Sequence, residues 1–205
     1  MVPTVGTMYG WMLTGLLTGL SLIIAIGAQN AYVLRQGLAR QHIGVVVAIC
    51  AISDLVLIVA GVAGVGALVR SHPTLLTVLR WVGAAYLVWF GVRSILAARR
   101  AHALTAHSLR AKSSVVLTTL ALTWLNPHVY LDTVLMLGNI ANQHGPAGRW
   151  WFAGGACLGS VIWFTGLGYG ARAASGWIGR PTVWRVLDVL IGLTMITIAV
   201  IMLLS

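Results

Sequence analysis

The sequence predicts an all-α, polytopic integral membrane protein of six transmembrane helices, arranged as two inverted repeats of three helices. The first observation is composition: 59% of the 205 residues are hydrophobic and 8% are charged, whereas about a quarter of the residues in a soluble domain are charged. The second is length, because a helix needs about 20 apolar residues to cross a bilayer. Six segments reach that length: 13–34, 43–69, 75–96, 115–137, 150–171 and 183–204.

The connections between these segments are short, apart from residues 99–114. Short connections place consecutive helices side by side. We therefore interpret residues 1–205 as a single transmembrane transporter domain, with one repeat at about residues 8–98, a cytoplasmic connecting loop at 99–114 and a second repeat at about 115–205. Because each repeat holds three helices, the copies must have opposite orientations in the membrane, as in many secondary transporters.

The first segment contains a polar break. Gly27 lowers helix stability, and Gln29 and Asn30 place two side-chain amides in an apolar run. Because an amide both donates and accepts, this pair could hold the backbone of an amino acid. Hydrogen bonds between helices would explain the same residues. Residues 1–11 contain no Lys or Arg, which favours a retained helix over a cleaved signal peptide.

The second segment contains Asp54 near its middle, in a chain that has three Asp and no Glu. An ionised carboxylate at the centre of a membrane helix costs roughly 2.5–3.5 kcal/mol on insertion scales, so it must face the bundle interior. There it could pair with a cationic substrate, carry a coupling proton or hold an arginine. The third segment includes Arg80 and Arg93 near its ends, where long side chains can reach the interface.

The fourth segment is interrupted by Asn126-Pro127. Proline removes a backbone donor and disfavours helical geometry at the preceding residue, so a second helix should begin at Pro127. The partial positive charge of that helix start suits a carboxylate, although proline kinks also occur as shape devices. His128 could relay protons or donate a single hydrogen bond. Asp132 lies a little over one turn beyond Pro127 and could border the same cavity.

The fifth and sixth segments carry fewer polar signals. Cys157 and Ser160 in the fifth segment faintly repeat a Cys and Ser at positions 50 and 53, and both cysteines are predicted to be free thiols. Tryptophans near the segment ends are typical of membrane interfaces. In the sixth segment, Asp188 follows Arg185 by three residues, a spacing that allows a local ion pair and favours a structural role.

Basic residues indicate the orientation. The net charge is +10, but the arginines are spread over helix ends and form no recognition helix, which argues against nucleic-acid binding. Lys and Arg accumulate on the cytoplasmic side of membrane helices. Nine of them lie in the first, third and fifth connections: Arg35, Arg40, Arg99, Arg100, Arg110, Lys112, Arg172, Arg180 and Arg185. We therefore expect both termini outside.

The two breaks also carry long motifs. Residues 27–37 read Gly-Ala-Gln-Asn-Ala-Tyr-Val-Leu-Arg-Gln-Gly, and residues 124–133 read Trp-Leu-Asn-Pro-His-Val-Tyr-Leu-Asp-Thr. Both resemble the signatures of the lysine/arginine exporter family, and residues 50–58 fit it too. The resemblance runs from the first helix to the last. Family members often have Pro where this chain has Ala28, which predicts a less sharp first break.

The resemblance implies secondary active export of basic L-amino acids from the cytoplasm of a bacterium across its inner membrane, coupled to a proton gradient or the membrane potential. No cofactor and no catalytic or metal site are expected. Proton coupling is expected at Asp54, Asp132 and His128. The residues expected to contact the substrate are Gln29, Asn30, Asp54, Asn126, Pro127, Tyr130 and Asp132.

Three alternatives remain. An exporter of neutral amino acids would use Asp54 and Asp132 for protons or packing only. A metal-cation exporter would need a compact group of ligands, which one His and separated Asp residues do not provide. The third alternative is an intramembrane enzyme or a structural membrane component. An enzyme would need a nucleophile and base on one face, whereas Ser53 and Asp54 are adjacent in a helix and point to different faces. Association into homo-oligomers is also open.

Overall fold

The structure is a computed structural model that describes residues 4–24, 27–65, 73–99, 112–176 and 181–204. Every regular element in these residues is helical. Most of the predicted connecting loop, residues 100–111, lies outside the described part of the chain. The elements are α1 (Val5–Ile23), α2 (Ala28–Leu38), α3 (Ile43–Ala60), η1 (Gly61–Val65), α5 (Pro73–Arg99), α6 (Lys112–Trp124), α7 (Pro127–Val129), η2 (Tyr130–Leu137), α8 (Gly138–Asn142), α9 (Gly145–Ala174) and α10 (Pro181–Leu204).

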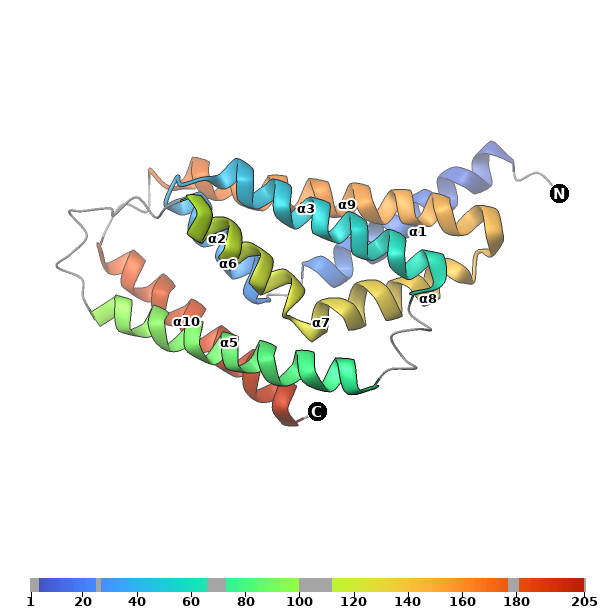
Figure 1. The fold of residues 1–205 in the computed structure, drawn as a ribbon. Coiled ribbons are helices and arrows are strands. Elements are labelled where there is room, and N and C mark those ends of the chain that lie inside the picture. Colours follow the sequence, from blue (N-terminus) through green and yellow to red (C-terminus); the bar gives the residue numbers. More distant parts are fainter. Residues whose placement is uncertain (1–3, 25–26, 66–72, 100–111, 177–180, 205) are drawn as a thin grey trace.

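The two halves of the chain have the same order of elements (Figure 1). Each begins with an interrupted helix, α1–α2 in the first half and α6 to α8 in the second. Each continues with two long helices, which are α3 and α5 in the first half and α9 and α10 in the second. The C-terminal ends of α2, α5 and α9 point toward the same side of the molecule, away from the end labelled N (Figure 1).

Both predicted breaks are present. α1 ends at Ile23 and α2 begins at Ala28, with an angle of 83° between the two helices. This bend is sharp although position 28 is Ala and not Pro. The second break separates α6, which ends at Trp124, from the helix that begins at Pro127 and runs on as the π-helical η2. Irregular backbone at membrane depth is tolerated only where protein or a cavity surrounds it.

The described residues include three helices that are long and apolar enough to cross a membrane, in the ranges Ile43–Val65, Gly145–Ala174 and Arg185–Leu204. A fourth span results if the bent pair α1–α2 counts as one. α6 is apolar but shorter, because the break at Asn126 ends it. Many large apolar side chains are exposed on the helices, as expected for a lipid-facing surface. The chain is therefore a multi-pass membrane protein, and six spans stay a prediction.

α1 and α9 pack closely through glycines. A Cβ on Gly15 would overlap the backbone carbonyl of Phe152, and a Cβ on Gly155 would overlap that of Met12. Both glycines are followed four residues later by another, Gly19 and Gly159. Without a hydrophobic driving force between helices in lipid, small residues that allow close backbone approach stabilise helix pairs. This pair forms one side of the fold.

Substituting Gly155 by Ala should destabilise the protein, because the added methyl group has no room beside the Met12 backbone. Overpacking of this kind costs about 1–3 kcal/mol. Gly154→Ala is the matched control, since a Cβ there meets nothing within 4 Å. Thermal melting of the detergent-purified proteins measures the effect. Equal melting temperatures for the two variants would contradict the close packing of α1 on α9.

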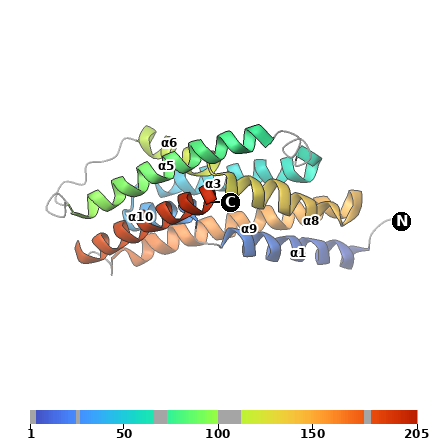
Figure 2. The ribbon, with the colours of Figure 1, turned by 90° about the horizontal axis from the view of Figure 1, so that it is seen from below.

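α5 and α10 pack along each other and form a pair of their own (Figure 2). Gly91 and Gly192 meet at their crossing. The pair touches the remaining helices mainly where α10 meets α2 and α5 meets α7. We call the remaining helices, α1 to α3 and α6 to α9, the main bundle. The largest apolar cluster lies between this bundle and the helix pair, with residues from both.

One end of the molecule carries Arg40 and Arg172, and we call it the basic end. Arg40, in the turn after α2, donates from Nε to the Ser175 hydroxyl after α9, with 2.5 Å between the two atoms. Arg172 lies in the last turn of α9. Connections that the sequence predicts to be cytoplasmic therefore meet at one end of the fold.

Candidate functional site

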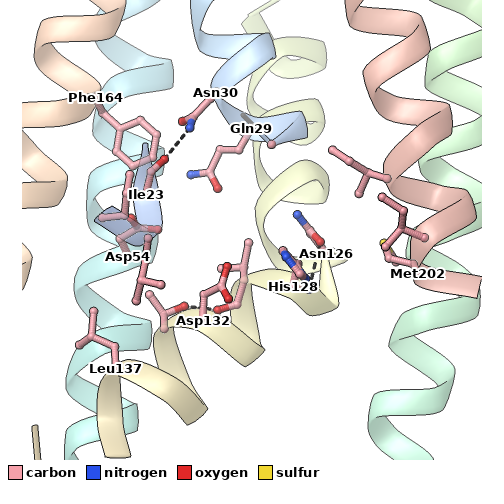
Figure 3. A pocket seen from close by; sticks show the side chains of 16 residues that line it. Ile23, Gln29, Asn30, Asp54, Asn126, His128, Asp132, Leu137, Phe164 and Met202 are labelled. Atoms are coloured by element: carbon pink, nitrogen blue, oxygen red, sulfur yellow. Dashed lines mark hydrogen bonds between the residues drawn. The ribbon is translucent and has the colours of Figure 1, made fainter. Parts of the chain in front are cut away.

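A cavity of about 200 Å³ lies between the two breaks (Figure 3). Its walls come from α1, α2, α3, α7, η2, α9 and α10. It brings together six of the eight residues predicted to bind substrate or protons: Gln29, Asn30, Asp54, Asn126, His128 and Asp132. These residues come from both halves of the chain, so the cavity forms only when the halves assemble.

Asp54 is the most deeply buried polar group in this wall, with 3% of its surface exposed. α3 places it opposite α9, where the Ser160 hydroxyl donates to its Oδ2 at 2.9 Å. The neighbouring Ser53 points elsewhere and accepts a hydrogen bond from Trp124 Nε1 at 3.0 Å. The two adjacent residues thus have separate partners, as expected for neighbours on a helix.

Gln29 begins α2 and points into the cavity (Figure 3). Its side chain is 8% exposed. Among the described residues, no acceptor lies within ordinary hydrogen-bond geometry of its amide nitrogen. The nearby Cys50 thiol is a weak acceptor. A buried donor without a partner is costly, so the Gln29 amide is the polar group of this wall with the most unused hydrogen-bonding capacity.

Asn30 has partners on both sides of its amide. Its Nδ2 donates to the Ile23 carbonyl at the end of α1, at 2.6 Å, and its Oδ1 accepts from Trp163 Nε1 of α9, at 3.2 Å. The first bond satisfies a carbonyl that the end of a helix leaves without an intrahelical partner. Asn30 lines the cavity and also joins α1, α2 and α9.

At the second break, side chains replace the hydrogen bonds that proline removes. Asn126 Oδ1 accepts from the His128 backbone N–H at 3.1 Å, which caps the helix that begins at Pro127. The Tyr130 hydroxyl donates to the Trp124 carbonyl at 2.9 Å. Tyr130 thus bridges the two sides of the break, and it is not among the residues that line the cavity.

His128 and Asp132 face the cavity one helical turn apart (Figure 3). Together with Asp54 of α3, they give the cavity two carboxylates and one imidazole. The side of the cavity formed by α10 is different, because it consists of Ile198, Ile201 and Met202. All polar side chains that line the cavity therefore come from the main bundle, whereas α10 contributes an apolar wall. The main bundle also adds apolar residues to the lining: Leu22, Ile23, Val129, Leu137 and Phe164.

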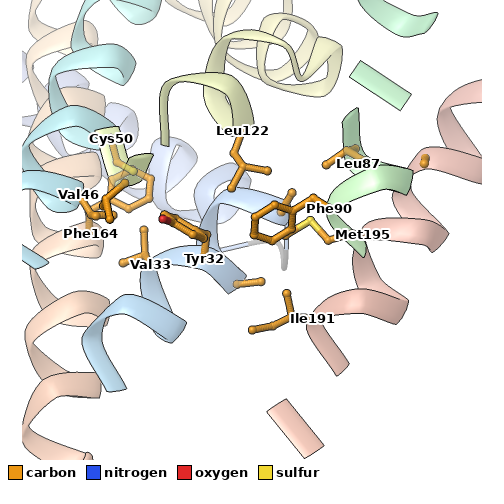
Figure 4. Packing of buried hydrophobic residues seen from close by; sticks show 14 of the residues in the cluster. Tyr32, Val33, Val46, Cys50, Leu87, Phe90, Leu122, Phe164, Ile191 and Met195 are labelled. Atoms are coloured by element: carbon orange, nitrogen blue, oxygen red, sulfur yellow. The ribbon is translucent and has the colours of Figure 1, made fainter. Parts of the chain in front are cut away.

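Two layers separate this cavity from the basic end. The first is an apolar layer that includes Tyr32 of α2, Phe90 of α5 and Met195 of α10 (Figure 4). The rings of Tyr32 and Phe90 meet edge to face, with centroids 5.9 Å apart. The second layer is an ion pair between Arg35 Nη2 and Asp188 Oδ1 at 3.0 Å. Along both α2 and α10, residues that line the cavity are followed by residues of the apolar layer and then by the ion pair.

Asp188 has the structural role that the sequence predicts, but its ion pair reaches another helix. Arg35 of α2 is the partner that the structure shows, whereas the sequence spacing suggested Arg185 on the same helix. A helix-to-helix pair restrains α10 against α2, which a local pair would not do.

Several residues of the site carry no strong sequence signal. Ser160 and Trp163 hold Asp54 and Asn30, and each looks like an ordinary residue of an apolar helix. The faint repetition of Cys and Ser around position 160 was the only pointer to the first. The apolar wall on α10 gives no signal either, since its residues resemble those that face lipid.

The fold and the site define a multi-pass membrane protein whose two broken helices enclose a polar cavity. The model of the family described as LysE type translocator matches residues 20–205. The chain belongs to this family. Its members are transporters and not enzymes, as the sequence predicted for this chain.

Curated relatives match over most of the chain. A protein of Corynebacterium diphtheriae named lysine exporter LysE is 40% identical, over 89% of this chain and 94% of its own length. A Yersinia enterocolitica protein named arginine exporter protein ArgO is 42% identical, over 88% and 89% respectively. A putative amino-acid transporter of Mycobacterium bovis is 43% identical, over 91% and 93%. No solved structure was found to match the chain.

Proposed function

We propose that this protein is a secondary active exporter of basic L-amino acids, lysine and arginine, from the bacterial cytoplasm. The observation that carries the proposal is the cavity, which combines two carboxylates with amide groups and the start of a helix. Carboxylates suit a cationic side chain, whereas amides and a helix start suit the backbone of an amino acid. The names of the relatives from Corynebacterium and Yersinia support the same substrates.

In this proposal, Asp54 and Asp132 bind the side-chain cation, and Gln29, Asn30 and Asn126 bind the amino acid backbone. Pro127 starts the helix that faces the substrate carboxylate. Tyr130 supports the break from behind. Asn30 and Asn126 already hold backbone groups, so they bind substrate with their remaining hydrogen-bonding capacity or through a local rearrangement.

Export of a cation needs an energy source. A positive charge that leaves a cell with a negative interior moves against about 2.3 kcal/mol per 100 mV. Exchange for an entering proton offsets this cost. Asp54 suits the exchange because a buried carboxylate cannot bind a proton and a substrate cation at full strength together. Asp132 and His128, one turn apart on the opposite wall, complete the proton pathway in this proposal.

We further propose six spans in two inverted repeats, with both termini outside in the inner membrane. The shared order of elements in the two halves supports the repeats, and the cluster of basic residues at one end supports the orientation. Neutral amino acids are the main rival substrates. The relatives named as lysine and arginine exporters favour neither these nor metal cations. Assembly into homo-oligomers stays a prediction.

The test is efflux of labelled lysine and arginine from proteoliposomes that are loaded internally and contain the purified protein. We expect both to leave faster than from protein-free liposomes, with leucine retained, and an imposed proton gradient to accelerate the efflux. Excess unlabelled lysine inside should slow arginine efflux through competition for one site. Transport of leucine without lysine or arginine would replace the proposal with neutral amino acid export.

A further inference from the structure

The contact between Asp54 and Ser160 joins the two halves of the chain at the site. Ser160 lies 106 positions from Asp54, on α9, and its side chain is fully buried. The hydroxyl donates to Oδ2 of the carboxylate at 2.9 Å. Asp54 lines the cavity, whereas Ser160 is not among the residues found to line it. Ser160 therefore holds the carboxylate from behind.

A serine hydroxyl suits both states of a carboxyl group. It donates to the ionised form, and after rotation it accepts from the protonated form. Its donation is stronger toward the ionised form, because hydrogen bonds to charged groups are roughly twice as strong as those between neutral groups. A hydroxyl at this point therefore favours the charged carboxylate, which is the form that attracts a cation.

The other groups around Asp54 compete little with Ser160 as hydrogen-bond donors to the carboxylate. Cys50 of α3 and Cys157 of α9 are weak donors near it. Gln29 of α2, His128 of α7 and Asp132 of η2 face it across the same cavity. Ser160 is the partner for which the described structure shows a hydrogen bond to this carboxylate.

We propose that Ser160 is a positioning residue that orients the Asp54 carboxylate toward the cavity and sets its balance between proton and substrate cation. This rests on the proposed export of basic amino acids. In this mechanism a residue of α9, in the second half of the chain, controls the charge of Asp54 on α3, in the first half. A movement of α9 away from α3 would lengthen this hydrogen bond and so change how firmly Asp54 holds its cation.

Ser53 supplies a matched control. It is also a buried serine, with 4% of its surface exposed, and it lies next to Asp54 in the chain. Its hydroxyl has a different partner, Trp124. Ser53→Ala and Ser160→Ala thus remove the same atom at similar burial, but only the second removes the donor to Asp54.

The first readout needs no substrate. Dicyclohexylcarbodiimide reacts with protonated carboxyl groups in apolar surroundings, and mass spectrometry of a proteolytic digest gives the labelled fraction of Asp54. At pH 7 we expect Ser160→Ala to label at least about threefold faster than wild type, because the ionised form loses its donor. Ser53→Ala should label at the wild-type rate. Asp54→Asn gives the blank.

The second readout is transport. Ser160→Ala should raise the half-saturating lysine concentration at least about fivefold, whereas Ser160→Thr, which keeps the hydroxyl, should stay near wild type. Lysine should protect Asp54 from labelling in wild type and less well in Ser160→Ala. Wild-type labelling and affinity in Ser160→Ala would overturn the proposal. So would a folded Ser160→Thr that is as impaired as Ser160→Ala.

If Ser160→Ala fails to accumulate in the membrane, Ser160→Cys takes its place. The thiol is similar in size and a weak donor, so faster labelling of Asp54 is again expected, and wild-type labelling overturns the proposal. Absence of lysine and arginine transport in the wild-type protein would refute the proposed function instead. The labelling rates would still decide whether Ser160 controls the Asp54 carboxyl group.

Discussion

Replacing Asp54 by Asn should lower lysine and arginine efflux by at least about 100-fold, because the cationic substrate side chain then loses a buried counter-charge. Removing one partner of a buried ion pair costs about 3–5 kcal/mol, and each 1.4 kcal/mol corresponds to a factor of ten. Asp54 is 3% exposed, so water cannot replace the missing charge. Initial rates of efflux from proteoliposomes with equal protein content measure the loss.

The same variant should fold normally. An Asn carbonyl oxygen can still accept the hydrogen bond that Ser160 gives to Asp54, so the contact between α3 and α9 persists. Membrane content and melting temperature should therefore stay near wild type. Efflux within about threefold of wild type would show that Asp54 binds neither the substrate cation nor the coupling proton, since each role requires an ionisable group.

Breaking the pair of Arg35 and Asp188 should strongly destabilise the contact between α2 and α10. Their side chains are 15% and 12% exposed and 3.0 Å apart. Asp188→Asn leaves the Arg35 charge without this partner, at an expected cost of about 3–5 kcal/mol. The double charge exchange, Arg35→Asp with Asp188→Arg, should recover part of this stability. Thermal melting in detergent measures the loss and the recovery of stability, and efflux rates show whether transport changes with them.

Arg185→Gln is the control for the ion pair. It removes a charge three residues from Asp188 on the same helix, at an exposed position. We expect it to melt within a few degrees of wild type, because surface charges contribute little. A large loss in this variant, together with a mild effect of Arg35→Gln, would show that Asp188 depends on its helical neighbour and not on α2.

The sequence predicted the two breaks because their signals are local. Proline, glycine and side-chain amides interrupt an apolar run at the residue where they occur, and the structure confirms helix ends at Ile23 and Trp124. The placement of Asp54 in the interior followed from the cost of a charge in lipid. Both inferences depend on one segment at a time.

Relations between distant segments were not predictable in the same way. Nothing in the sequence pairs Asp54 with Ser160 or Arg35 with Asp188, because each contact depends on how complete helices cross. Hydropathy also does not distinguish an isoleucine that faces the cavity from one that faces lipid. The wall formed by α10 therefore became visible only in the assembled fold.

The division of the cavity into a polar and an apolar wall has a mechanical consequence. A bound amino acid would form its directional bonds with the main bundle and only van der Waals contacts with Ile198, Ile201 and Met202. The α5–α10 pair could then slide or tilt past the substrate without breaking a hydrogen bond to it. Such a movement would instead have to break the ion pair between Arg35 and Asp188, which lies outside the cavity. Recognition and motion can thus evolve on separate helices, and changes that alter transport speed on α10 need not alter which amino acid is chosen.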